Sequence, residues 1–466
     1  MTGRHDVAIV GAGPAGIFAA LELARLRPDL GLVILEQGPD LDARACPIHK
    51  RSQNCAQCSP CSITTGWGGA GAFSDGKLTL TTEFGGSLVE YMPEDEVQRL
   101  VNHVDGIYLE FGAPKELHGQ DSGALRDLAR RAAGAELQLV PAVIRHLGTD
   151  RCMEILGELR RYLGSRAEIR TGARVERVEV GADGVAGVTL GDGSRLEARY
   201  VALMPGRAGA EWMAREAARL QLPLAANPVD IGVRVEVPAD FLEPLTEVAY
   251  EAKLVYNTRA FDDQVRTFCM NPHGEVVVEN YGGLLTVNGH AYAGRKTDRS
   301  NFALLVSKTF TEPFHEPITY GQHVARLANM LGGGVLVQRL GDLRAGRRTT
   351  EKRLAKGMVR PTLKDATPGD LSLVLPYRHL VDILEMLTAL DKVAPGVNSS
   401  HTLLYGVEVK FYSSRLSLSQ VLETRIPRLF AAGDGAGVTR GLVQASASGV
   451  VVAREIARRE GQPCPQ

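Results

Sequence analysis

The chain has 466 residues, a length that suits two large domains. Its formal net charge of −1 at pH 7 gives no basis for a nucleic-acid or anionic-membrane partner. With 44% hydrophobic and 23% charged residues, the composition is that of a soluble globular protein. The sequence contains no apolar run long enough for a membrane span, and its apolar start lacks the features of a signal peptide. We therefore expect a cytoplasmic protein.

The first forty residues have the pattern of a dinucleotide-binding βαβ unit. Residues 6–10 form an apolar run typical of a buried strand, residues 17–26 have helical periodicity, and residues 32–35 form a second apolar run. The sequence GAGPAG joins the first strand to the helix. The cofactor residues expected there are Gly11, Gly13, Ala15 and Gly16.

Each part of this pattern has a physical role. Gly11 allows a tight turn, Gly13 lets a pyrophosphate approach the backbone, and Gly16 lets helix and strand pack closely. The pyrophosphate would lie at the positive end of the helix dipole. Glu36, which ends the second strand, would accept hydrogen bonds from the ribose hydroxyls. The sequence therefore predicts a bound dinucleotide.

A second motif near the end of the chain favours FAD over NAD. An apolar strand at 429–432 leads into GDGAG at 433–437, and a helix is predicted from about 441 to 457. This arrangement resembles the closing motif of glutathione-reductase-like flavoproteins. The resemblance implies that Asp434, preceded by Gly433, holds the ribityl chain of FAD, and that the backbone near Gly441 faces the flavin.

Two further segments complete the expected FAD site. The sequence GWGGAGAFSDGKL at 66–78 resembles the segment that passes the pyrophosphate and the flavin ring in the same superfamily. The cofactor residues predicted in it are Gly68, Gly69, Ser74 and Lys77. A β-meander is predicted between 167 and 204 because Asp-Gly turns occur at 183–184 and 192–193. By the same resemblance, its first strand, near Val175, lies beside the adenine.

Four segments together (66–78, 204–212, 229–238 and 433–449) resemble a family of FAD-dependent, or NAD(FAD)-utilizing, dehydrogenases. The resemblance implies an α/β fold: a Rossmann-like FAD domain of glutathione-reductase type with an inserted α+β substrate domain. The predicted boundaries are 1–215 and 415–466 for the FAD domain and 216–414 for the insertion. Outside the glycine-rich segment at 66–78, the sequence has no second GxGxxG, which argues against a separate NAD(P) domain.

Four of the seven cysteines lie close together in the sequence, namely Cys46, Cys55, Cys58 and Cys61. In a cytoplasmic protein such a group indicates metal binding or redox chemistry rather than a disulfide framework. The four thiolates would suit a [4Fe–4S] cluster. A structural zinc is the first alternative, and a redox disulfide between Cys58 and Cys61 is the second.

The predicted insertion contains two alternating strands with charged residues on one face, at 230–237 and 407–412. In relatives by fold, a sheet from the second domain covers the flavin and supplies catalytic side chains. The catalytic candidates are His401, Glu408, Lys410 and Tyr412. His401 is included because imidazole titrates near neutral pH. The alternative is that the charged face is a row of solvent-facing ion pairs.

We therefore expect an FAD-dependent oxidoreductase that acts on a small organic substrate. Its electrons would come from NAD(P)H, or from a ferredoxin-like carrier through a cysteine-bound iron–sulfur cluster. Two alternatives stay open: a redox-neutral flavoenzyme such as an isomerase with structural zinc, and a non-catalytic flavin protein that relays electrons.

Overall fold

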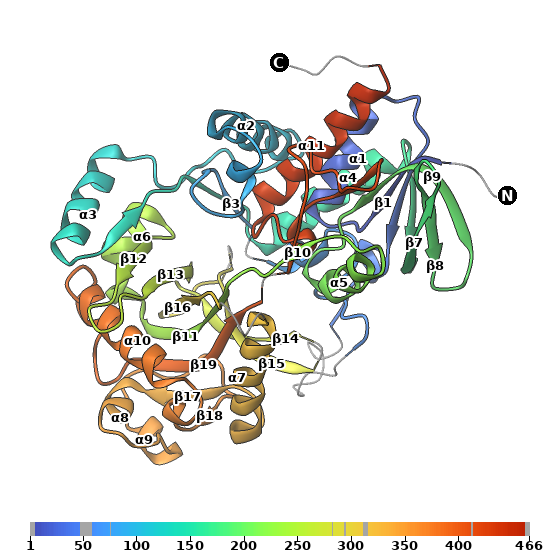
Figure 1. Cartoon of the computed structure of the whole chain (residues 1–466). Coiled ribbons are helices and arrows are strands. Elements are labelled where there is room, and N and C mark those ends of the chain that lie inside the picture. Colours follow the sequence, from blue (N-terminus) through green and yellow to red (C-terminus); the bar gives the residue numbers. More distant parts are fainter. Residues whose placement is uncertain are drawn as a thin grey trace. The chain divides into compact units, whose positions relative to one another are not determined.

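The computed structural model describes residues 5–46, 58–74, 76–281, 283–292, 295–310, 316–411 and 413–461 (Figure 1). The chain has a mixed α/β fold that divides into two compact units. Unit 1 comprises Met1–Lys115, Arg145–Asn227 and Tyr412–Gln466. Unit 2 comprises Glu116–Ile144 and Pro228–Phe411. Each unit has its own hydrophobic core, so the two are described separately.

The main sheet of unit 1 is built around β1 (His5–Val10), which pairs in parallel with β2 (Leu32–Glu36) and with β9 (Arg195–Leu203). β6 (Glu168–Thr171) extends the sheet beyond β2, and β21 (Leu429–Ala431) pairs with β9; both pairings are parallel. β1, β2 and β21 are short apolar runs with few or no exposed residues, as parallel strands covered on both faces require.

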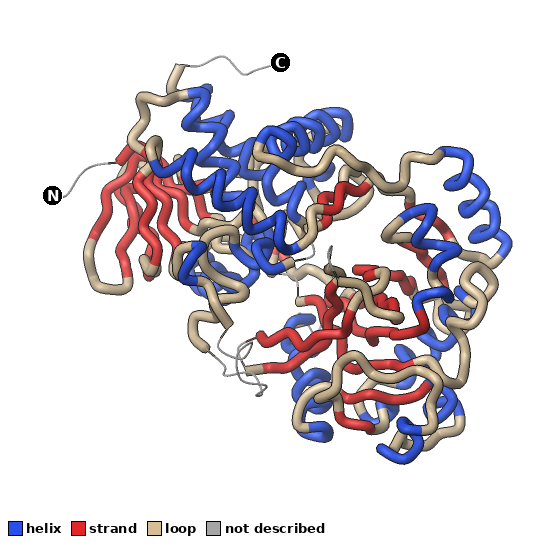
Figure 2. Tube along the Cα trace, turned by 180° about the vertical axis from the view of Figure 1, so that it is seen from behind, coloured by secondary structure: helices blue, strands red, loops and turns tan. Residues whose placement is uncertain are grey.

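The predicted meander continues this sheet on the other side of β9. β8 (Gly184–Leu190) pairs antiparallel with β9, and β7 (Val175–Gly181) pairs antiparallel with β8. Both connections contain the Asp-Gly turns that predicted them, so this part of the sequence analysis is confirmed. Figure 2 shows the strands of unit 1 from behind, in red.

Two helices from distant parts of the sequence pack against each other in unit 1. α1 (Pro14–Leu26) follows β1, and α11 (Leu442–Arg459) follows β21. Figure 1 shows α11 in red beside α1 in blue. A Cβ atom at Gly449 of α11 would lie 2.0 Å from the carbonyl oxygen of Ala15, so glycine is needed for this close approach.

The other helices and short strands of unit 1 connect these elements. The remaining helices are α2 (Glu94–Glu110), α4 (Thr149–Gly164) and α5 (Ala210–Arg219). The remaining strands are β3 (Lys77–Thr79), β10 (Leu224–Ala225), β20 (Arg415–Leu416) and β5 (Ile144–His146), which spans the boundary between the units. The 3-10 turns are η1 (Leu41–Ala43), η3 (Gly69–Phe73), η4 (Leu88–Glu90), η5 (Arg207–Gly209) and η8 (Asp434–Ala436).

Unit 2 is built on an eight-stranded sheet in the order β18-β17-β19-β11-β16-β13-β12-β4. Its strands are β4 (Gln138–Val140), β11 (Val229–Pro238), β12 (Lys253–Asn257), β13 (Gln264–Asn271), β16 (Arg299–Lys308), β17 (Leu336–Arg339), β18 (Thr367–Pro368) and β19 (Leu403–Lys410). All neighbours are antiparallel except β17 and β18. β14 (Glu275–Tyr281) and β15 (Leu284–His290) form a separate hairpin that contacts this sheet.

The helices of unit 2 are α3 (Ser122–Gly134), α6 (Glu243–Ala249), α7 (Pro317–Gly332), α8 (Leu340–Arg344), α9 (Glu351–Ala355) and α10 (Tyr377–Leu390), with 3-10 turns η6 (Ala239–Phe241) and η7 (Leu371–Leu373). α7 and α10 pack on the strands of the large sheet. Within the described parts of the chain, no helix combines the length and the apolar character that crossing a membrane requires.

The units differ from the boundaries expected from the sequence. The sequence analysis assigned all of 1–215 to one domain, whereas Glu116–Ile144 lies in unit 2. The reason is that β4 pairs antiparallel with β12, so that Val140 lies opposite Lys253 and Gln138 lies opposite Val255. In addition, α3 contacts α6. A pairing across more than a hundred residues leaves no signal in local periodicity.

Candidate functional site

The loop between β1 and α1 is held in place by backbone packing. Gly11 has φ +107°, and a Cβ atom there would lie 2.1 Å from the carbonyl oxygen of Met204. A Cβ atom at Gly16 would lie 1.9 Å from the carbonyl oxygen of Gly11. Both glycines are therefore required by the protein itself.

Gly13, which caps the N-terminus of α1, differs from its two neighbours. Its φ of −79° and ψ of −175° are open to any residue, and a Cβ atom there would meet no protein atom within 4 Å. No side chain caps the helix at this end, and Pro14 occupies its first turn. The structure thus presents bare backbone at the positive end of a helix dipole, where neither strain nor packing requires glycine.

Glu36 joins three backbone segments through its carboxylate. Oε2 accepts a hydrogen bond from the N–H of Ala12 at 2.9 Å, and Oε1 accepts from Gly38 at 2.8 Å and from Gly66 at 2.9 Å. The residue is only 6% exposed. The predicted ribose-binding acid therefore also organises the loop after β1 and the loop that precedes Gly68.

The glycine-rich segment lies against the β1–α1 loop. The N–H of Gly68 donates to the carbonyl of Ala12 at 2.8 Å, and a Cβ atom at Gly69 would lie 3.1 Å from Cα of Gly13. Ser74, which follows η3, donates through Oγ to the carbonyl of Gly71 at 2.8 Å. Lys77 is buried at the start of β3.

The C-terminal motif lies at the end of β21. Asp434 begins η8, and its Oδ1 accepts a hydrogen bond from Oγ1 of Thr439 at 2.8 Å; Oδ2 is 3.6 Å from Nε of Arg207. Burial raises the pKa of Asp434, while Arg207 and Thr439 act in the opposite direction. Gly441 caps α11 without a side-chain hydrogen bond, so α11 also begins with unsatisfied backbone N–H groups.

These segments meet because the carboxyl ends of four parallel strands share one edge of the sheet. Three backbone hydrogen bonds join those ends, from Gly11 to Leu35 at 2.8 Å, from Met204 to Val10 at 2.7 Å and from Ala432 to Leu203 at 3.0 Å. Val175 begins β7 near the same edge, since Ala173 donates to the carbonyl of Glu36 at 2.8 Å. Open α/β sheets bind ligands at this edge.

In unit 2, the two charged rows predicted from the sequence meet inside the protein. The guanidinium of Arg234 on β11 is paired with Glu408 on β19, with Nε 2.8 Å from Oε2, and it donates to Oδ1 of Asn288 at 2.8 Å. Nζ of Lys410 is 3.1 Å from Oε1 of Glu408 and 3.6 Å from Oε2 of Glu279. Two cations and two carboxylates form this cluster, which we call the charged quartet.

The quartet is not the solvent-facing row that the sequence analysis kept as an alternative. Arg234 and Glu408 have no exposed surface, and Lys410 is 5% exposed. Burial lowers the pKa of Lys410, but Glu408 and Glu279 outweigh it and hold that pKa above its ordinary range. A lysine held in its protonated form is a poor proton donor near neutral pH, so the geometry favours a positioning role for Lys410.

The other two catalytic candidates are not part of the quartet. His401 precedes β19 and contacts Arg339, with Nδ1 3.3 Å from Nη2. β19 spans roughly 25 Å at about 3.3 Å per residue, so His401 and Lys410 lie at opposite ends of it. Tyr412 lies outside the described residues.

The cysteines do not assemble into a metal site among the described residues. Cys46 and Cys61 are partly buried and Cys58 is exposed, while Cys55 lies outside the described ranges. Within those ranges, no three His, Cys, Asp or Glu side chains lie close enough to hold a metal ion. The three described thiols thus do not fit the expected [4Fe–4S] or zinc geometry, which needs its ligands gathered around one centre.

Arg44 is a residue of this region that the sequence analysis missed. Its guanidinium donates to the carbonyls of Ser62 at 2.9 Å, Ile63 at 2.8 Å and Trp67 at 2.5 Å. Burial lowers the pKa of Arg44 to about 10, while the nearby carboxylate of Glu36 acts in the opposite direction. A single arginine in a loop follows no local pattern, so the sequence carried no signal for this role.

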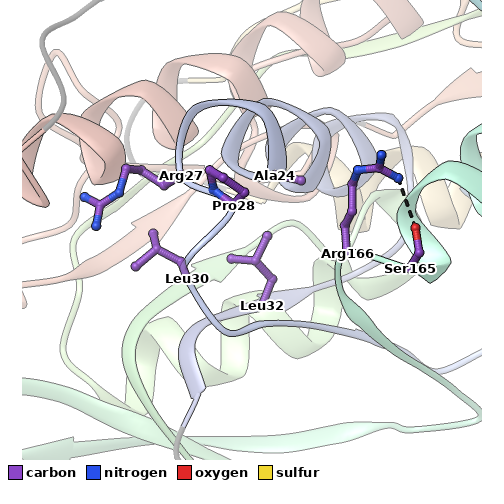
Figure 3. Close-up of a pocket in the computed structure, with 7 residues that line it drawn as sticks. All are labelled: Ala24, Arg27, Pro28, Leu30, Leu32, Ser165 and Arg166. Atoms are coloured by element: carbon purple, nitrogen blue, oxygen red, sulfur yellow. Dashed lines mark hydrogen bonds between the residues drawn. The ribbon is translucent and has the colours of Figure 1, made fainter.

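One surface pocket of about 360 Å³ lies in unit 1, away from these residues (Figure 3). It is lined by Ala24, Arg27, Pro28, Leu30, Leu32, Ser165 and Arg166. Nη1 of Arg166 donates to Oγ of Ser165 at 3.0 Å, the dashed line in Figure 3. Because these residues surround the C-terminal end of α1, the pocket is not part of the edge that Gly13 and Glu36 occupy.

Comparison with solved structures gives matches of low identity. The glycine oxidase from Geobacillus kaustophilus is 15% identical with a TM-score of 0.43, over 99% of this chain and 96% of that one. The L-proline dehydrogenase from P. horikoshii is 11% identical with a TM-score of 0.44, over 100% of this chain and 96% of that one. TM-scores this low do not establish a common fold.

Sequence comparison gives one relative and one family. An uncharacterised protein of Clostridium beijerinckii is 28% identical over 488 aligned positions, which cover 98% of this chain and 81% of that protein. Residues 228–411, which form nearly all of unit 2, match the family described as "FAD-dependent protein, C-terminal domain-like".

Proposed function

We propose that this protein is an FAD-dependent oxidoreductase whose unit 1 binds the cofactor. The observation that carries the proposal is Gly13, a bare helix N-terminus that neither strain nor packing explains. A ligand that approaches the backbone closely would explain it. The family match of residues 228–411 supports FAD as that ligand.

The residues of unit 1 fit the parts of FAD in a consistent order. Gly13 and the first turn of α1 would hold the pyrophosphate, since unsatisfied N–H groups and the helix dipole favour anions there. Glu36 has three of its acceptor positions filled and keeps capacity for a ribose hydroxyl. Asp434 would accept from the ribityl chain, and Gly441 would present the first turn of α11 to the flavin.

When bound, FAD supplies two-electron hydride chemistry, and the protein supplies binding and orientation. We propose that the reductant is NAD(P)H or a small organic substrate. We do not propose an iron–sulfur cluster as an electron donor, because the described cysteines are not gathered around one centre. The charged quartet would fix β11 and β19 rather than transfer protons, since its charges balance inside the sheet.

The test begins with the flavin content of the purified protein. We expect a yellow protein that releases about one FAD per chain on denaturation, identified by chromatography and mass. Protein that stays colourless after incubation with FAD, and that takes up only NAD, would reject the cofactor.

The class of reaction is tested separately, by anaerobic mixing of the holoprotein with NADH, NADPH and small amines and alcohols. Bleaching of the flavin band, followed by recovery with an electron acceptor, is the expected result. A substrate converted with no change in its oxidation state would support the isomerase alternative instead.

A further inference from the structure

We propose that three arginines of unit 2 bind the phosphate dianion of a small soluble phosphate monoester. The site lies where β17 passes into α8 and where α8 connects to α9, two helices labelled in Figure 1. The three residues, which we call the arginine cluster, are Arg339, Arg347 and Arg353. This inference is independent of the proposed FAD chemistry, because every residue that carries it belongs to unit 2 and none of them needs the cofactor.

The sequence around the arginine cluster is more basic than the rest of the chain. Residues 339–356 contain seven arginines and lysines but only two acidic residues, Asp342 and Glu351, whereas the whole chain has a formal net charge of −1. Five of these cations are exposed. A local excess of positive charge attracts anions most strongly where the fold gathers it at one place.

Asp342 gathers the three arginines around one carboxylate. Nε of Arg347 is 3.0 Å from Oδ1, Nε of Arg353 is 3.9 Å from the same oxygen, and Nη1 of Arg339 is 3.9 Å from Oδ2. Among the described residues, no other carboxylate forms an ion pair with any of the three. Three positive charges therefore meet one negative charge, which leaves an excess of two.

Asp342 cannot serve all three cations fully. It is 1% exposed, its Oδ1 accepts a hydrogen bond from Arg347, and its Oδ2 accepts from Oγ1 of Thr349 at 2.9 Å. Arg339 and Arg353 lie beyond hydrogen-bond distance of the carboxylate. Neighbouring guanidinium groups repel each other, and the repulsion grows where water is partly excluded. A second anion at the cluster would remove this repulsion.

The guanidinium groups are held by other protein groups rather than free in solvent. Nη1 of Arg353 donates to the carbonyl of Arg348 at 2.8 Å, and Nη1 of Arg339 donates to the carbonyl of Arg353 at 3.3 Å. Nη2 of Arg339 also lies 3.3 Å from Nδ1 of His401. These contacts fix the directions of the side chains before a ligand arrives, which lowers the entropic cost of binding.

Two members of the cluster are accessible to a ligand. The side chain of Arg347 is 54% exposed and that of Arg353 is 39% exposed, whereas that of Arg339 is 15% exposed. Because Arg347 and Arg353 both approach Oδ1 of Asp342, their guanidinium groups are neighbours and can present N–H groups to one anion. Arg348, which is exposed and forms no ion pair among the described residues, adds to the positive charge there.

The excess of two charges matches a phosphate monoester. This group carries about −1.5 to −2 charges at pH 7 and has three acceptor oxygens, and arginine binds such oxygens in a bidentate manner. A carboxylate would balance only one of the two charges. Residues 339–356 contain no aromatic side chain for base stacking and expose no large hydrophobic side chain for insertion into a bilayer. A small soluble ligand is therefore favoured over a nucleic acid or a membrane.

The experiment titrates the full-length protein with glycerol 3-phosphate at about pH 7.5 and low ionic strength, followed by isothermal titration calorimetry. We expect saturable binding of one equivalent per chain, and no binding of glycerol at the same concentrations. Lowering the pH to 5 should raise the Kd about tenfold, because the second pKa of a phosphate monoester is near 6 and the dianion is then a minor form.

Two variants and a matched control locate the site. Arg347→Gln and Arg353→Gln should each raise the Kd about tenfold by removing charge-assisted hydrogen bonds. Arg344→Gln removes the same charge from the same segment, but Arg344 contacts Asn398 and, two residues from Asp342 on α8, lies on another face. It should change the Kd by less than about twofold. Circular dichroism of the unliganded variants checks that each is folded, and the exposed Arg347 alone suffices for the test.

Three results would overturn the proposal. The first is no saturable binding of glycerol 3-phosphate at ~10 mM. The second is an equal loss of affinity in Arg344→Gln and Arg347→Gln, which would indicate diffuse attraction by the whole segment. The third is another class of ligand: inorganic phosphate that binds where glycerol 3-phosphate does not, or an oligonucleotide or phosphatidic acid vesicles that glycerol 3-phosphate fails to displace. None of these measurements involves the flavin, so failure here is distinct from failure of the proposed function.

Discussion

Replacing Gly13 with alanine tests whether a ligand approaches the backbone at this position. The added Cβ atom would meet no protein atom, and alanine adopts the φ and ψ of Gly13 without strain. At a helix N-cap, alanine is less favourable than glycine by about 0.5–1 kcal/mol. The reduced freedom of the unfolded chain offsets this by about 0.4–1 kcal/mol. The free energy of unfolding should therefore change by less than about 1 kcal/mol.

The affinity for FAD should change much more. A methyl group at the position of the pyrophosphate would force it away from the N–H groups of α1. We expect a 10- to 100-fold higher Kd, which corresponds to about 1.4–2.7 kcal/mol. The assay is titration of the apoprotein with FAD, followed by quenching of flavin fluorescence, beside guanidinium unfolding followed by circular dichroism.

Gly16→Ala is the matched control, because its Cβ atom would lie 1.9 Å from the carbonyl oxygen of Gly11. It should destabilise the apoprotein by about 3 kcal/mol or more, since backbone must move to make room. The reasoning is refuted if Gly13→Ala binds FAD as tightly as the wild type does. It is equally refuted if Gly13→Ala unfolds as easily as Gly16→Ala.

Three further predictions concern buried polar groups. Glu36→Gln should lower the free energy of unfolding by about 1–3 kcal/mol in urea titration, because one amide oxygen cannot accept from three N–H groups; an unchanged midpoint would contradict this. Lys410→Met should cost about 3–5 kcal/mol by leaving Glu408 under-compensated, whereas the exposed Lys392→Met should stay within about 0.5 kcal/mol; equal effects would refute the role of the quartet. Burial lowers the pKa of His379 to about 4, so the stability that its neutral form provides should be present above about pH 6.5 and be lost as the pH falls toward 4. His379→Asn should remove about 3 kcal/mol of that loss in unfolding titrations between pH 7 and 4, and an identical pH profile would refute it.

The elements that the sequence predicted best are those whose pattern lies in a short stretch of consecutive residues. The strand–loop–helix pattern at the start of the chain and the β7–β9 meander follow from local periodicity and from glycine at defined turns. The two hairpins of the meander pair strands that are neighbours in the sequence. The physical causes are therefore visible in short windows of sequence.

Where the prediction was incomplete, distant contacts decide the structure. The alternating charges of 230–237 left open whether this face of the strand meets the solvent, yet every residue from Val229 to Val237 is buried. Burial is possible because β15 and β19 bring Asn288 and Glu408 to Arg234, and Lys410 pairs with Glu408. No window of one strand contains those partners, so the pattern alone could not distinguish paired charges inside a sheet from charges in water.

The packing of α11 on α1 also determines when the unit can fold during synthesis. β21 and α11 belong to the same sheet and core as β1 and α1, but they are translated last. At ~5–20 residues per second, a ribosome needs roughly 10–45 s to proceed from β9 to β21. Through that interval the face of α1 that packs on α11 lacks that partner, while the strands of unit 2 emerge complete. A chain that stops before β21 therefore leaves the α11-facing side of α1 uncovered, and unit 1 cannot complete its core.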